Sequence, residues 1–73
     1  MRFTYTNHAR ERMQKRKVTE FEIEQTILNP ENWHYDEDDP NKYHAIKHWA
    51  HRTLEIVYVS KIDEIKIITV FVL

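Results

Sequence analysis

The chain contains no cysteine and no glycine among its 73 residues, and it has only two prolines. The absence of cysteine excludes disulfide bonds and thiolate chemistry. The absence of glycine excludes a phosphate-binding loop and a dinucleotide-binding fingerprint, so no cofactor is expected. Ser60 is the only serine, and no nucleophile elbow surrounds it, which argues against a serine hydrolase.

Long apolar runs are also missing from the sequence. No segment is long and apolar enough to span a bilayer, and none reads as a signal peptide. We therefore expect a cytoplasmic protein that does not enter a membrane. The length predicts a single domain over residues 1–73 with a modest core.

The net charge of −1 conceals a strong segregation of charge along the chain. Residues 1–17 carry six lysines and arginines against a single acid, whereas residues 19–39 carry eight acids and no lysine or arginine. A protein that binds nucleic acid regardless of sequence is usually basic overall. Any contact with nucleic acid should therefore be local and sensitive to salt. The alternative is that the two zones neutralise each other within the fold.

The first half of the chain carries two helix patterns. The stretch "HARERMQKR" contains several good helix formers and no breaker, and Ala9 and Met13 mark a thin buried stripe on it. Thr19 and Glu22 have the spacing of a capping box, which predicts the start of a second helix. Pro30 then ends that helix, because it disfavours a helical conformation in the residue before it.

The second half of the chain predicts strands. The stretches "YHAIKHW", "TLEIVYVS" and "IKIITVFVL" are rich in β-formers, and "KIDE" can close a hairpin between the last two. The stretch "RFTYT" favours a short strand at residues 2–5, and "NWHYDEDDPNK" reads as a loop or a frayed strand start. The expected class is α+β, with two N-terminal helices packed on an antiparallel sheet of three to four strands.

Five histidines raise the question of a metal site. His44, His48 and His51 have spacings of four and three, which on a helix would place three imidazoles on one face and suggest zinc. In a strand, however, alternation sends His51 to the opposite face from the other two. No acidic residue lies between Lys42 and Thr53 to serve as a further ligand. We therefore expect no metal.

The basic first helix offers a simpler chemistry. In RNA cleavage the ribose 2′-hydroxyl is the nucleophile, so the protein supplies only proton transfer and positive charge. Imidazole exchanges protons near neutral pH, and His8 lies one helical turn before Arg12, whose guanidinium can hold a phosphate. Lys15 and Arg16 extend the same stripe as candidate contacts to RNA phosphates. The alternative interpretation is an ordinary solvated basic helix face.

Two stretches at the ends of the chain carry a resemblance to a known family. "HARERMQKRKVTEFEIEQTILNP" resembles the opening signature of the small-domain family of unknown function numbered 4258, and "RTLEIVYVSKIDEIKIITVFVL" is similar to its closing pair of strands. That family is grouped by fold analogy with RelE-like and colicin-like ribonuclease toxins. The resemblance implies a RelE-like fold, with His8 as acid or base, Arg12 and Arg52 as charge stabilisers, and Thr69 as an orienting hydrogen-bond donor.

These observations lead to two functional hypotheses. The first is a small metal-independent endoribonuclease, the toxin of a bacterial toxin–antitoxin pair, with RNA as substrate and a cognate antitoxin as partner. The second is a non-catalytic interaction domain of the same fold. Its apolar last stretch "ITVFVL" would then be an exposed strand edge that pairs with another chain, including a second copy in a homodimer.

Overall fold

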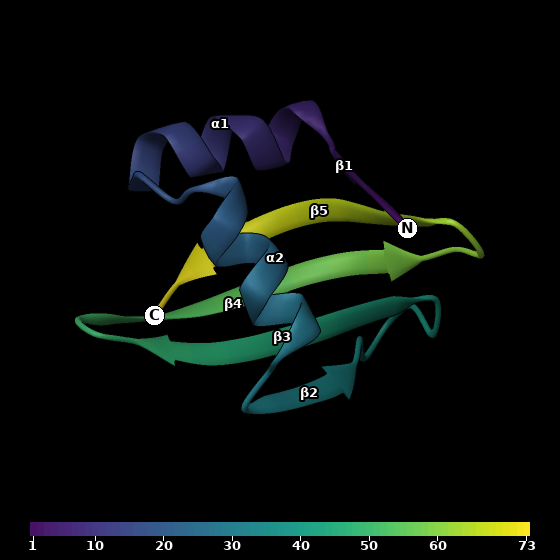
Figure 1. Ribbon diagram of the computed structural model, residues 1–73. Coiled ribbons are helices and arrows are strands. Elements are labelled where there is room, and N and C mark those ends of the chain that lie inside the picture. The colour runs from purple at the N-terminus through teal and green to yellow at the C-terminus, as the bar shows by residue number, and fades with distance from the viewer.

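In a computed structural model, which describes residues 1–73, five strands form one sheet in the order β1-β5-β4-β3-β2 (Figure 1). The first strand, β1, pairs in parallel with β5, and the three other pairings are antiparallel. The elements follow the chain as β1 (Arg2–Tyr5), α1 (Asn7–Arg16), α2 (Glu20–Leu28), β2 (Asn32–Tyr35), β3 (Lys42–Trp49), β4 (Arg52–Ser60) and β5 (Glu64–Val72).

The predicted architecture, a RelE-like pair of helices on an antiparallel sheet of three to four strands, is wrong. The sheet is mixed and has five strands, and the two helices are short. Two segments account for the difference. The strand at Arg2–Tyr5 joins β5 in parallel, and the segment expected as a loop or frayed strand contains β2. Aromatic contacts hold β2 to β3, because Trp33 and Tyr35 of β2 both pack against the Tyr43 ring of β3.

The predicted helix signals are confirmed. Thr6 caps α1 by accepting a hydrogen bond from the backbone of Ala9, and the capping box of Thr19 and Glu22 begins α2. The helix α1 ends at Arg16, and its C-cap residue Lys17 has a φ of 55° in the left-handed region. Glycine is the residue that adopts this conformation without cost, so the chain carries local backbone strain at this position.

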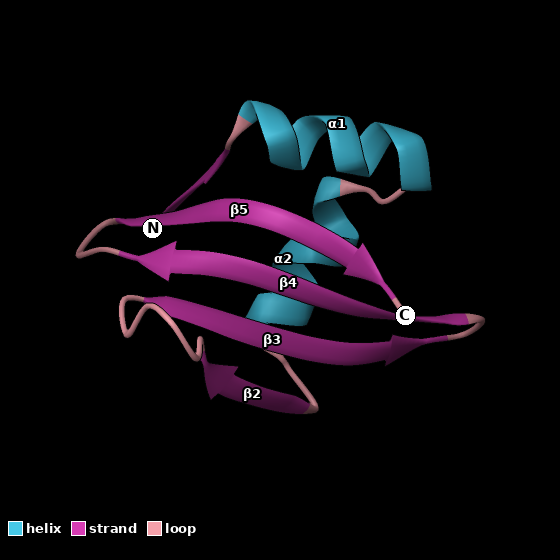
Figure 2. Ribbon diagram, turned by 180° about the vertical axis from the view of Figure 1, so that it is seen from behind, coloured by secondary structure: helices cyan, strands magenta, loops and turns pink.

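The two faces of the sheet differ in what covers them. The helix α2 lies across one face, over β3 and β4, whereas α1 runs along the β5 margin (Figure 1). Seen from behind, the strands of the other face have no helix in front of them (Figure 2). We call these the helix face and the open face. No helix in the structure is long and apolar enough to cross a membrane.

The hydrophobic core lies on the helix face. Strand alternation sends Leu54 and Ile56 of β4 to this face together with their register neighbours Ala45 and Val70, and all four are fully buried. Residues from both helices complete the core. Its eleven members are Ala9, Met13, Val18, Ile23, Ile27, Ala45, Leu54, Ile56, Ile65, Ile67 and Val70.

A β-bulge in β5 decides which residues reach the open face. Tyr58 pairs with Ile67 and Val57 pairs with Thr69, so Ile68 has no partner on β4. The extra residue shifts the alternation by one position. Ile67 points into the core before the bulge, Val70 does so after it, and Thr69 consequently lies on the open face with Val57.

Candidate functional site

The first helix meets the last strand through a histidine and a threonine. His8 lies in the first turn of α1 and is exposed, and its Nε2 atom lies 2.9 Å from the Thr69 Oγ1 atom. Either group can donate in this hydrogen bond, depending on the tautomer of the ring. The structure therefore brings together the two residues that the resemblance assigned to proton transfer and to its orientation.

Arg12 lies beside this pair at the same edge of the sheet. Its Nε atom donates a hydrogen bond to the Val70 carbonyl oxygen at 3.1 Å, and its guanidinium carbon lies 5.7 Å from the centre of the Phe71 ring. Both contacts fix the side chain against β5. Neither terminal nitrogen of Arg12 makes a hydrogen bond or ion pair within the protein, so this end of the fork can bind an anion.

These contacts also close the edge of β5 beyond the end of β1. The Ile68 carbonyl accepts a hydrogen bond from the Thr6 hydroxyl at 2.9 Å, and Arg12 satisfies the Val70 carbonyl. With β1 and α1 on one side and β4 on the other, β5 is not a free edge. The expectation that "ITVFVL" is an exposed strand edge finds no support as far as Val70, because the Thr6 and Arg12 side chains occupy the carbonyl groups of Ile68 and Val70.

Lys15 and Arg16 lie in the last turn of α1. Both are exposed, and neither side chain forms an ion pair. With His8 and Arg12 they form one stripe, which we call the α1 stripe. Its positive charge lies next to the open face and is not neutralised by the acidic zone of the chain.

Arg52 does not join this group. It lies on the helix face, where its Nη2 atom contacts both carboxylate oxygens of Glu22 at 3.0 and 3.1 Å. The same guanidinium donates to the backbone carbonyls of Arg16 and Lys17, at 2.8 and 3.0 Å. Arg52 therefore connects β4 to the end of α1 and the start of α2. The assignment of Arg52 as a charge stabiliser for the His8 site finds no support in this geometry.

Glu22 is held in its charged form by this arrangement. Partial burial would raise the pKa of its carboxyl group. Hydrogen bonds from the Thr19 backbone and from Arg52 outweigh that effect, and the pKa lies below its usual value. The ion pair is part of the structural framework.

A second polar cluster lies on the open face, at its β2 margin. The two ring nitrogens of His44 each contact a carboxylate, Nδ1 with Glu55 at 2.6 Å and Nε2 with Asp36 at 2.7 Å. The His34 ring stacks on the His44 ring, with centroids 4.6 Å apart. Burial lowers the pKa of His44, but the hydrogen bonds to Asp36 and Glu55 more than offset it and raise the pKa overall. The same bond from His44 lowers the pKa of Asp36.

Sequence reasoning missed this cluster, although a signal for it exists. In the strand register, His34 is opposite His44 and His44 is opposite Val57. Glu55 lies two residues before Val57 on β4, so its side chain is on the same face as these residues. His44, His48 and His51, the three histidines whose spacing suggested zinc, do not come together in the structure. His48 contacts Thr53 at 3.0 Å, and His51 lies in the turn between β3 and β4.

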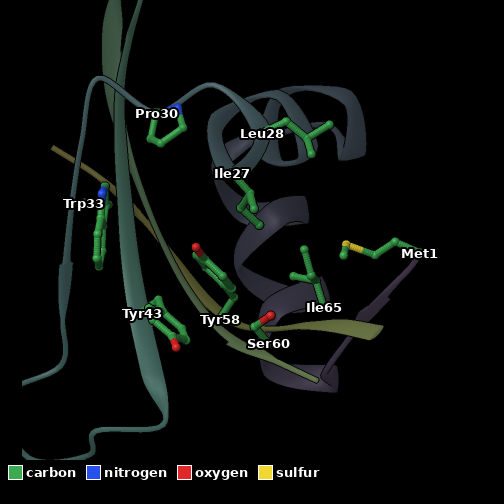
Figure 3. Close-up of a pocket in the computed structure, with 9 residues that line it drawn as sticks. All are labelled: Met1, Ile27, Leu28, Pro30, Trp33, Tyr43, Tyr58, Ser60 and Ile65. Carbon is green, nitrogen blue, oxygen red and sulfur yellow. The ribbon is translucent and has the colours of Figure 1, made fainter. Parts of the chain in front are cut away.

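The single pocket of the protein lies away from both clusters. It has a volume of about 470 Å³ and opens on the helix face, between the end of α2 and the strands (Figure 3). No pocket lies between α1 and the sheet, so the His8 site is an open surface. The pocket is lined by Met1, Ile27, Leu28, Pro30, Trp33, Tyr43, Tyr58, Ser60 and Ile65.

Comparison with known proteins gives one result. No curated protein and no solved structure matches the chain, so the RelE-like similarity has no structural neighbour to support it. One family model matches residues 5–72, and its description is "Domain of unknown function (DUF4258)". The match includes His8 and Arg12 of α1 and all of β5, which together form the His8 site. Because it covers nearly the whole chain, the protein belongs to the DUF4258 family.

Proposed function

We propose that the protein is a metal-independent endoribonuclease and acts as the toxin component of a bacterial toxin–antitoxin system. The observation that carries this proposal is the contact between His8 and Thr69, with Arg12 fixed one turn further along the same edge of β5. An exposed imidazole, a hydroxyl that orients it and an arginine with free donors are the groups that phosphodiester cleavage by a ribose hydroxyl requires.

The proposed step uses His8 as the general base. In this step the Thr69 hydroxyl accepts a hydrogen bond from Nε2–H, the reverse of the donor role that the resemblance implied, and the unprotonated Nδ1 atom of His8 takes the proton of the 2′-hydroxyl. The oxygen then attacks phosphorus, the bond from phosphorus to the 5′-oxygen breaks, and that oxygen takes a proton from water. The products are a 2′,3′-cyclic phosphate and a 5′-hydroxyl end.

The neighbouring residues suit a single-stranded RNA. The free terminal nitrogens of Arg12 would stabilise the charge on the phosphoryl oxygens. Phe71, whose ring lies under the guanidinium and is 39% exposed, offers a stacking surface for a base. Lys15 and Arg16 would hold phosphates on one side of the cleaved bond, and their exposure makes this contribution sensitive to salt.

Purified protein incubated with a mixed RNA tests the proposal. Wild type is expected to release 2′,3′-cyclic phosphate ends without added metal. We expect His8→Ala to lower the rate by about 100-fold or more, as loss of a general base does, and Arg12→Ala to lower it by a similar factor. His34→Ala changes an exposed histidine of β2, at the margin of the sheet opposite to the α1 side, and is the matched control. Equal cleavage by wild type and His8→Ala would overturn the assignment.

A separate experiment addresses the toxin role. Induced expression of the chain without its neighbouring gene is expected to arrest growth, and His8→Ala is expected to relieve the arrest at equal protein levels. Circular dichroism of the variant confirms that the fold is kept, which is expected because the His8 ring makes only the Thr69 hydrogen bond. Normal growth on strong induction of wild type would contradict the toxin role while leaving the cleavage assay to judge the chemistry.

One observation favours the alternative of a non-catalytic interaction domain. The outer strand β2 is a free edge of the sheet, and all four of its residues are exposed, including Trp33 and Tyr35. Strand addition at this edge, by a second copy or another chain, would cover both rings. Sedimentation of wild type and of Tyr35→Pro, which removes an outward-facing N–H of β2, distinguishes a β2-mediated dimer from a monomer.

A further inference from the structure

Three neighbouring strands place potential metal ligands side by side on the open face. His34 of β2 is the register partner of His44 of β3, and Glu55 of β4 lies diagonally across from His44. One ligand atom from each of the three residues lies within 4.8 Å of the other two. The set is distinct from the 44–48–51 spacing of the sequence, since it is assembled by strand pairing and not by helical periodicity.

The separation of these atoms is close to what a metal ion needs. Zinc binds imidazole nitrogen and carboxylate oxygen at about 2.0–2.2 Å, so two ligand atoms in a tetrahedral site lie about 3.5 Å apart. The His34 and His44 rings are stacked with an interplanar angle of 18°, so the His34 ring must turn out of the stack to direct a nitrogen at the same ion as His44. His34 is free to make this turn, because its ring is exposed and forms no hydrogen bond.

The surroundings of His44 resemble those of a metal-binding histidine. Its Nε2 atom is held by the Asp36 carboxylate at 2.7 Å, which fixes the ring and directs Nδ1 towards Glu55. Histidines that bind metals through one nitrogen usually donate the other N–H to a carboxylate. Asp36 itself is fixed by hydrogen bonds from the backbones of Asp38 and Asp39. This acidic turn therefore has a role that its composition alone did not indicate.

We propose that His34, His44 and Glu55 bind a divalent transition-metal ion, with zinc the best fit to two imidazoles and one carboxylate. Three protein ligands leave one position for water. The ion would take the place of the direct contact between His44 Nδ1 and the Glu55 carboxylate. The inference does not rest on the nuclease function, because the His8 site lies at the opposite margin of the open face.

Titration of the untagged chain with Co²⁺, followed by visible absorbance and then by displacement with Zn²⁺, tests this proposal. We expect one equivalent of metal to bind with micromolar affinity or better. His34→Ala is expected to weaken binding at least tenfold while leaving the fold intact, and Asp36→Asn is expected to weaken it 10- to 100-fold through loss of ring orientation.

His48→Ala is the matched control, because His48 lies on the same strand and the same face but outside the cluster. It is expected to bind cobalt as tightly as wild type. The proposal fails if wild type binds no cobalt at 100-fold molar excess, or if His34→Ala binds as tightly as wild type. RNA cleavage that persists in His34→Ala would separate this result from the proposed nuclease function.

Discussion

Replacing Arg52 with alanine is expected to lower the free energy of unfolding by about 3 kcal/mol, the low end of the range for breaking a buried ion pair by removing one partner. The Arg52 and Glu22 side chains are only 17% and 18% exposed. The substitution leaves the Glu22 carboxylate unpaired and removes the donors to two carbonyl groups at the end of α1. A domain of this length has a total stability of about 4–11 kcal/mol, so the loss is a large fraction of it.

The same reasoning gives a pH dependence. The pKa of Glu22 is lower in the folded protein than its ordinary value of 4.5, because the Thr19 and Arg52 hydrogen bonds outweigh burial. The unfolded chain therefore binds the proton first as the pH falls. The stability from the ion pair is fully present above about pH 4.5 and is lost as the pH falls through the folded pKa. The difference in stability between wild type and Arg52→Ala should stay constant above about pH 4.5 and shrink as the pH falls below it.

Urea unfolding followed by circular dichroism measures this difference directly. Arg10→Ala provides a matched control, since Arg10 pairs with Glu20 at the surface, where both side chains are about half exposed. Solvent-exposed pairs contribute about 0–1 kcal/mol, and the stacking of the Arg10 guanidinium on the Tyr5 ring at 4.2 Å adds a similar amount, so Arg10→Ala should cost at most about 2 kcal/mol and less than Arg52→Ala. If Arg52→Ala were as stable as wild type and instead lost ribonuclease activity, the placement of Arg52 on the helix face would be refuted.

Three further stability predictions follow from local contacts. Thr19→Ala removes the N-cap of α2 and is expected to cost about 1 kcal/mol in urea unfolding. Lys17→Gly relieves the left-handed strain at the end of α1 and is expected to raise stability by up to about 1 kcal/mol, whereas Lys17→Ala should not. Tyr5→Phe removes the hydrogen bond to Glu24 and should cost about 1 kcal/mol; it should also remove a phenol whose pKa is raised by burial and by Glu24, seen in ultraviolet titration.

Local signals along the chain predicted most of the elements. Caps and apolar stripes depend on contacts a few residues apart, so Thr19 and the buried pair Ala9 and Met13 could be identified from sequence. The number of strands could not. The parallel pairing of β1 with β5 joins residues about sixty positions apart, and β2 lies in a segment whose acidic run suggested a loop. A strand of four residues is too short to show a clear alternation of apolar and polar residues, so its pairing with a distant strand cannot be predicted from the sequence.

The position of Arg52 could have been read from alternation. It lies two residues before Leu54 and four before Ile56 on one strand, so all three share a face, and that face is the core. The resemblance to ribonuclease toxins instead implied that Arg52 stabilises charge at the His8 site, a role that requires the other face of the sheet. Family analogy assigns a residue type to a position, but alternation decides which face of the sheet the residue reaches.

Thr69 shows the opposite case, in which simple alternation gives the wrong face. Counting from the buried Ile65 and Ile67 in steps of two places Thr69 in the core. The bulge at Ile68 reverses this, sends Val70 inward and brings the Thr69 hydroxyl to the His8 ring. Val70 is the better core residue, so burying it in place of a threonine hydroxyl favours the bulged register. The contact on which the proposed ribonuclease depends is therefore a consequence of core packing on the other face of the same strand.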